Sequence, residues 1–201
     1  MHPWDRLGVE HVWQPRRLRC LVVGENPGDV KSAYFYEVPG SYATDPIVVR
    51  RCLLRGLQSQ KLLATATLQG FRDAGFLFDH AIRCPLPAED VEKERNKARR
   101  YTVTRVQCPA HLRASLSQAP IVWVMGHLAN NAVVNLVAKE FPNLIKEFPK
   151  EKRKISWHPF PDEAAPGSRF FVSEYFTWRN EKDSARICEA FSQFARARGV
   201  F

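Results

Sequence analysis

Residues 21–30 read LVVGENPGDV, an apolar and largely β-branched run that stops at the turn GENPG. Short runs of valine and leucine are typical of buried strands, and the glycines and the proline that follow end the run in a tight turn. The turn also carries a carboxylate and an amide side by side, Glu25 and Asn26. It is therefore either an ordinary turn between a strand and a helix or a backbone segment that presents these two groups to a ligand.

This run is the first of several short apolar segments that are separated by helical patterns. The alternation of strand and helix indicates crossover units and hence a parallel sheet covered by helices on both faces. We expect an α/β fold in a single domain over residues 1–201. The expected strands lie at 19–24, 76–82, 121–126 and 155–158, and the expected helices at about 45–60, 61–74, part of 90–117, 128–139 and 182–198.

Composition limits the class of protein. The chain has 45% hydrophobic and 25% charged residues, as soluble globular proteins do. Its longest apolar stretch, 121–125, is too short to span a bilayer, and the first 17 residues lack the apolar core of a signal peptide. The cysteines are scattered, without a CxxC pair, which is typical of reduced thiols. We therefore expect a cytoplasmic protein that does not bind membranes.

The charge balance is strongly basic. The chain carries 30 Lys and Arg against 21 Asp and Glu, a net charge of +9, with a pI near 9.6. Such a surplus on a small domain attracts polyanions, so nucleic acid is the leading candidate partner.

Four unusual segments coincide with the expected strand ends. They are GENPG (24–28), HAIRCPLP (80–87), GH (126–127) and HPFP (158–161). In an open parallel sheet, ligands bind beyond the carboxyl ends of the strands, so these segments are expected to meet at one edge. Each also has a simpler interpretation: GENPG as a plain turn, His80 as a hydrogen-bonded core histidine, HPFP as a proline-stiffened loop and His127 as the start of a helix.

Taken in order, these segments resemble the uracil-DNA glycosylase superfamily. GENPG is close to the GEAPG of its iron–sulfur branch and the GINPG of its mismatch-specific branch. The segment WHPFPDEAAPGSRFFVSEYFTWRN (157–180) resembles the HPSP loop and following stretch of ordinary uracil-DNA glycosylases. The similarity runs from about residue 19 to about residue 185. It implies a three-layer αβα sandwich around a four-stranded, mainly parallel sheet.

The resemblance also implies roles for three catalytic residues. A glycosylase extrudes the base from the duplex, and breaking the sugar–base bond creates an oxocarbenium-like sugar and a departing base anion. Glu25 would stabilise the positive sugar or act as a base, and Asn26 would position the water. His158 would donate a hydrogen bond to the oxygen of the leaving base. Alternatively, Glu25 or Asn26 caps the next turn.

Further residues would bind the base and the DNA. Phe35, or its neighbours Tyr34 and Tyr36, would stack on the extruded base, with core packing as the alternative. His80 lies where the iron–sulfur branch reads uracil with an asparagine. The expected DNA contacts are Gly28, Gly126, His127 and Ser156 to phosphates, Phe160, Pro161 or Pro166 as a wedge in the duplex, and Arg169 to a phosphate.

The chain departs from the family at two points. His80 offers the base a different pattern of donors and acceptors than asparagine does, so the preferred base can differ from uracil. The iron–sulfur branch also needs four cysteines that begin with a CxxC, which this chain lacks. We therefore expect neither a cofactor nor a bound metal. The alternative is an iron–sulfur cluster held by Cys20, Cys52, Cys84 and Cys108.

The sequence thus favours a monomeric, monofunctional DNA glycosylase for base excision repair. It would flip out uracil or a related deaminated base and remove it hydrolytically from damaged DNA, in the cytoplasm in association with the nucleoid. The main alternative is a non-catalytic nucleic-acid-binding relative with the same fold, and a more distant one is an enzyme that acts on free nucleosides.

Overall fold

The computed structural model describes residues 7–26, 34–83, 86–99, 109–141, 143, 168–176 and 181–201. Four parallel strands form one sheet in the order β2-β1-β3-β4. The strands are β1 (Cys20–Gly24), β2 (Phe76–His80), β3 (Ile121–Met125) and β4 (Phe170–Ser173). The predicted α/β class and parallel sheet are confirmed for this part of the chain.

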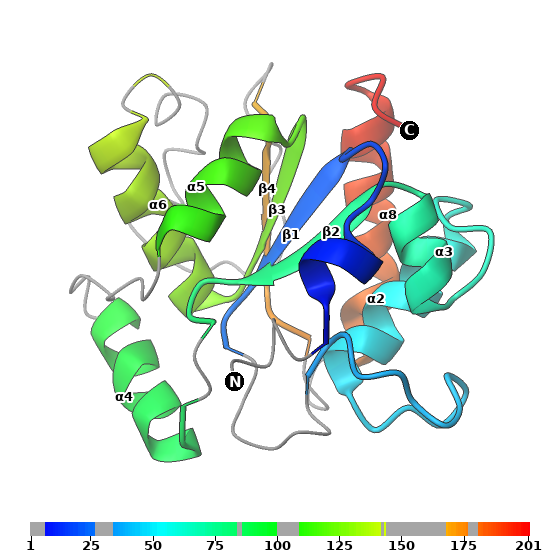
Figure 1. The fold of residues 1–201 in the computed structure, drawn as a ribbon, viewed down its shortest axis with the longest axis horizontal. Helices are drawn as coiled ribbons and strands as arrows, with labels where there is room; N and C mark the ends of the chain where they lie inside the picture. Colours follow the sequence, from blue (N-terminus) through cyan, green and yellow to red (C-terminus); the bar gives the residue numbers. More distant parts are fainter. Residues whose placement is uncertain are drawn as a thin grey trace.

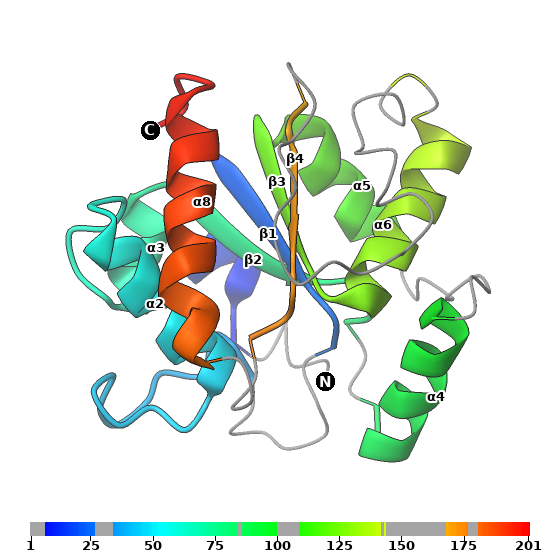
Figure 2. The ribbon, with the colours of Figure 1, turned by 180° about the vertical axis from the view of Figure 1, so that it is seen from behind.

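Helices cover both faces of the sheet (Figures 1 and 2), as in a three-layer arrangement. On one side lie α5 (Pro109–Gln118) and α6 (His127–Glu140), and on the other α2 (Val48–Ser59), α3 (Leu68–Asp73) and α8 (Ser184–Arg196). The remaining helices are α4 (Ala88–Arg99), which packs on α6, a π-helix η1 (Val9–Trp13) and a 3₁₀ turn η4 (Glu181–Asp183). Among the described residues, every helix is too short or too polar to cross a bilayer.

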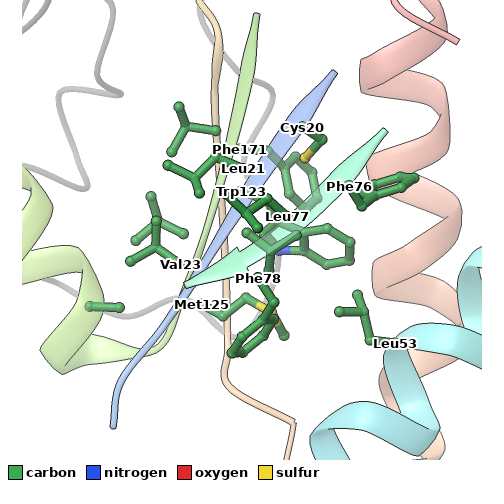
Figure 3. Packing of buried hydrophobic residues seen from close by; sticks show 14 of the residues in the cluster. Cys20, Leu21, Val23, Leu53, Phe76, Leu77, Phe78, Trp123, Met125 and Phe171 are labelled. Carbon is green, nitrogen blue, oxygen red and sulfur yellow. The ribbon is translucent and has the colours of Figure 1, made fainter. Parts of the chain in front are cut away.

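Strand alternation sorts the core into two layers (Figure 3). Leu21 and Val23 of β1 point toward α6, whereas Phe76 and Phe78 of β2 point toward the opposite layer of helices. Trp123 of β3 is fully buried on this second side, where its ring stacks on Phe191 of α8 at 4.3 Å between centroids. The aromatic layer therefore joins the middle of the sheet to α8.

The fourth strand of the described sheet was not predicted, and the predicted one is not tested. Residues 155–158 lie outside the described residues, and the strand beside β3 in the described sheet is Phe170–Ser173, which pairs in the register Trp123↔Phe171. The sequence FFVS is apolar but only four residues long, and a run of that length carries too little periodicity to separate a strand from a loop.

One predicted helix is much shorter than expected. The pattern over 61–74 predicted a continuous helix, but α3 begins only at Leu68. Lys61 adopts a left-handed conformation with φ 59°, which ends the preceding helix. Thr67 then caps α3, since its hydroxyl accepts a hydrogen bond from the Gly70 amide at 3.0 Å.

Candidate active site at the carboxyl ends of the strands

Glu25 and the start of α6 meet at the carboxyl end of the sheet, although they are about a hundred residues apart. Glu25 follows β1 and is 5% exposed, and its Oε1 accepts a hydrogen bond from the Leu128 amide at 3.3 Å. The first amides of a helix have no partner within the helix and form the positive end of its dipole. The carboxylate therefore caps α6, and its position is fixed by a helix that follows a different strand.

Gly126 makes this approach possible. Its φ is 95°, in a region that side chains disfavour, and a Cβ added to it would lie 2.5 Å from Oε1 of Glu25. Its amide donates to the Ser173 carbonyl of β4 at 2.9 Å. Gly126 thus connects the ends of β1, β3 and β4, and its amide already has a protein partner. The predicted phosphate contact through Gly126 would have to replace that partner, whereas His127, half-buried, begins α6 as the simpler interpretation predicted.

Asn26 joins the end of β1 to the chain that follows β2. Its Nδ2 donates to the Ile82 carbonyl at 3.0 Å, and its Oδ1 accepts from the Leu86 amide at 3.4 Å. The two adjacent polar residues of GENPG therefore reach in different directions, Glu25 toward α6 and Asn26 toward the segment after β2. Together they connect the end of β1 to the chain segments that follow β2 and β3.

His80 lies opposite Gly24 at the end of β2 and is 6% exposed. Its ring stands edge-on to Phe78, with centroids 5.1 Å apart. The structure thus brings His80 to the same end of the sheet as Glu25 and Asn26. It also packs the imidazole against the aromatic layer, as the core interpretation predicted.

A buried ion pair beside His80 was missed by the sequence analysis. Asp79 is fully buried, and its carboxylate accepts from Nε and Nη2 of Arg83 at 3.0 and 2.9 Å. The same carboxylate accepts from the His80 amide at 2.7 Å. The spacing of four residues between Asp79 and Arg83 was the only available signal, and it is common on protein surfaces.

The aromatic candidates for base stacking lie in the core. Phe35 is 2% exposed and stacks on Phe78 with centroids 4.1 Å apart and planes 7° apart. The hydroxyl of Tyr36 accepts from the Phe78 amide at 2.7 Å, and burial raises the pKa of this phenol, so it stays protonated. This placement matches the core-packing alternative. Base stacking by Phe35 stays a prediction that requires the ring to be uncovered.

Arg169 lies far from the other candidates. It precedes β4, at the amino end of the sheet, where its Nη1 donates to the Ala119 carbonyl at 3.4 Å. The structure therefore does not bring Arg169 to the edge that carries Glu25. The remaining predicted site residues, Gly28, Ser156, His158, Phe160 and Pro161, lie outside the described residues.

The described cysteines are buried thiols. Burial raises the pKa of Cys20, Cys52 and Cys188, which disfavours the thiolate that metals and clusters require. Among the residues that the structure describes, no group of three His, Cys, Asp or Glu side chains is placed to hold a metal ion. Cys84 and Cys108 lie outside this part of the chain.

Comparison of the chain with protein-family models, with curated proteins and with solved structures found no match.

Proposed function

We propose that this protein is a DNA glycosylase that removes uracil or a related deaminated base. One observation carries the proposal: a buried carboxylate at the end of β1 contacts the start of α6, with Glu25 Oε1 3.3 Å from the Leu128 amide. Motifs that are remote in the sequence therefore share one edge of a parallel sheet, which is where such sheets bind ligands. The net charge of +9 favours DNA as the substrate.

The proposed chemistry is hydrolysis of the bond between the sugar and the base. A water molecule adds to the anomeric carbon, the glycosidic bond breaks with its electrons on the base, and the base leaves as an anion that is then protonated. Glu25 stabilises the developing positive charge on the sugar. Asn26 orients the water, and His158 donates a hydrogen bond to the base oxygen. The proposal includes a monomer without a cofactor that acts on nucleoid DNA in the cytoplasm.

Release of free base from modified oligonucleotides tests the proposal. Uracil, hypoxanthine and xanthine should be presented in single-stranded, matched and mismatched DNA. We expect Glu25→Gln to lower the rate of release at least about a hundredfold while DNA affinity changes little. Glu189→Gln removes an exposed carboxylate of α8 and serves as the matched control. Full activity of the Glu25→Gln variant, or no release by the unaltered protein from any substrate, would contradict the proposal.

His158→Ala tests the leaving-group step separately. If His158 acts on the departing base, its loss should reduce the rate of release by a much larger factor than it reduces DNA affinity. Equal reductions in both would assign His158 to binding alone.

A second candidate function, a DNA-binding protein without glycosylase activity, is favoured by the contacts of Glu25 and Asn26. The Glu25 carboxylate and both ends of the Asn26 amide already have partners within the protein. Their roles in the fold are sufficient to account for both residues. Salt-sensitive binding without base release on the full panel would support this function over catalysis.

A further inference from the structure

A basic cavity lies at the end of the sheet that is opposite to Glu25. It has a volume of about 700 Å³ and is bounded by the segment from η1 to β1 and by the end of α3. Among the described residues, its lining includes Arg16, Arg17, Arg19 and Arg72 but just one carboxylate, that of Asp73. Figure 1 shows this segment running from η1 to the start of β1, beside α3. The cavity therefore carries a local excess of positive charge at a site that the proposed catalysis does not use.

The Asp73 carboxylate balances only one of the four positive charges of these arginines. Asp73 accepts two hydrogen bonds of 2.6 Å from the Gln69 amide and one of 3.2 Å from Nε of Arg72. These donors, together with the charge of the nearby Arg16, hold its pKa below the ordinary range. Arg16 and Arg17 are exposed, and neither forms an ion pair with a carboxylate of the described residues.

Two further arginines are held in place and shape the wall. Nη1 of Arg72 donates to the Val12 carbonyl at 2.8 Å, which ties α3 to η1. The guanidinium of Arg19 lies 5.2 Å from the ring centroid of Phe201. Arginines fixed in this way lose less side-chain entropy when they bind an anion.

Gly75 lines the cavity, and its backbone lies against the arginine segment. Its φ is 91°, and a Cβ added to it would lie 2.7 Å from the Arg17 carbonyl and 2.8 Å from Cγ of Arg19. Its carbonyl accepts from the amides of Arg19 and Cys20 at 2.8 and 3.1 Å. The arginine segment is thereby attached directly to the residue that precedes β2.

We propose that this cavity is a second phosphate-binding site, which holds the sugar–phosphate backbone of a nucleic acid. Guanidinium groups match the geometry of phosphate oxygens and bind them through paired hydrogen bonds. The exposure of Arg16 and Arg17 suits an extended strand that passes over the surface. The five-residue strands place the cavity roughly 16 Å from the Glu25 end of the sheet. The site thus binds a different stretch of nucleic acid from the one that would be processed at Glu25.

The test compares two double variants with the same change of charge. Arg16→Ala/Arg17→Ala removes the exposed arginines of the cavity, and Arg55→Ala/Lys139→Ala removes exposed charges on α2 and α6. Each lowers the net charge from +9 to +7. Binding of an undamaged 30-base-pair duplex is measured at several salt concentrations. We expect the cavity variant to bind roughly tenfold more weakly and to reduce the salt slope by about 2, since each lost phosphate contact lowers it by about 1.

Three results would overturn the proposal: an unchanged slope in the cavity variant, equal changes in both variants, or a cavity variant that loses binding of inorganic pyrophosphate while its DNA binding is unchanged. The last would indicate a site for small phosphates instead. Circular dichroism checks that both variants are folded. Base release measured on the same proteins separates this site from the proposed catalysis, because binding to the cavity can be present whether or not Glu25 supports the reaction.

Discussion

The hydrogen bond between Glu25 and the Leu128 amide shows what a single residue contributes to this edge of the sheet. The sequence pointed to Glu25 because a carboxylate on a Gly/Pro turn is unusual. The alternative interpretation was that Glu25 caps the turn that follows it directly in the sequence. The helix that Glu25 caps is α6, which begins about a hundred residues later. Local sequence patterns carry no information about such a partner, because the contact depends on how β1 and β3 pair.

Stability measurements on Glu25 variants test the capping role independently of any reaction. Glu25→Ala removes the acceptor for the Leu128 amide and should lower the free energy of unfolding by about 1–2 kcal/mol. Glu25→Gln retains an oxygen acceptor and loses only the charge at the helix end, so it should cost about half as much. Urea denaturation monitored by circular dichroism provides both values. A glutamine variant as unstable as the alanine variant would contradict capping through the side-chain oxygen.

At the scale of elements, the packing of α2 against α8 depends on a glycine. A Cβ added to Gly56 would lie 2.3 Å from Sγ and 2.9 Å from Cβ of Cys188, so the two helices leave no room for a side chain at this point. The sequence predicted both helices, and the structure confirms them at nearly the expected bounds. It could not predict which positions touch, because periodicity defines the buried face of a helix but not its partner.

Gly56→Ala should therefore destabilise the protein despite alanine's better helix propensity. We expect a loss of about 1–3 kcal/mol from overpacking, against a gain of about 1 kcal/mol from propensity. Combining it with Cys188→Ala should restore part of the loss, which a double-mutant cycle of unfolding free energies detects. Gly40→Ala, at a position where an added Cβ meets no atom within 4 Å, is the control. Strictly additive effects of the two substitutions would rule out the contact as the cause.

At the scale of the whole molecule, a buried arginine ties the chain between residues 34 and 45 to α2. Arg50 of α2 is 1% exposed and forms an ion pair with the equally buried Asp45 through Nη2 at 2.8 Å from Oδ1. Its Nη1 also donates to the carbonyls of Tyr34 and Phe35 at 3.2 and 2.9 Å. The sequence analysis predicted the parallel sheet and most of the helices because short apolar strand-like runs alternate with helical segments. It missed this pair because a buried arginine resembles an exposed one in sequence.

Breaking this buried ion pair should strongly lower the free energy of unfolding of the protein. Arg50→Met leaves the Asp45 carboxylate buried without its partner and should cost about 3–5 kcal/mol. Asp45→Asn in the same chain should recover part of that loss. Arg51→Met removes the neighbouring arginine, whose ion pair with Glu181 is partly exposed, and should cost only about 1 kcal/mol. Thermal and urea unfolding compare the three variants, and equal losses for Arg50→Met and Arg51→Met would show that burial of the pair is not decisive.

The hydroxyl of Tyr36 affects how readily the outer strand β2 can pair with other molecules in a concentrated solution. β2 is an outer strand of the described sheet, and outer strands invite pairing with extended segments of other molecules. The Phe78 amide, in the middle of that strand, is already bonded to Tyr36 at 2.7 Å. A strand that pairs with β2 at Phe78 would have to displace this buried aromatic side chain, which disfavours strand addition at that position.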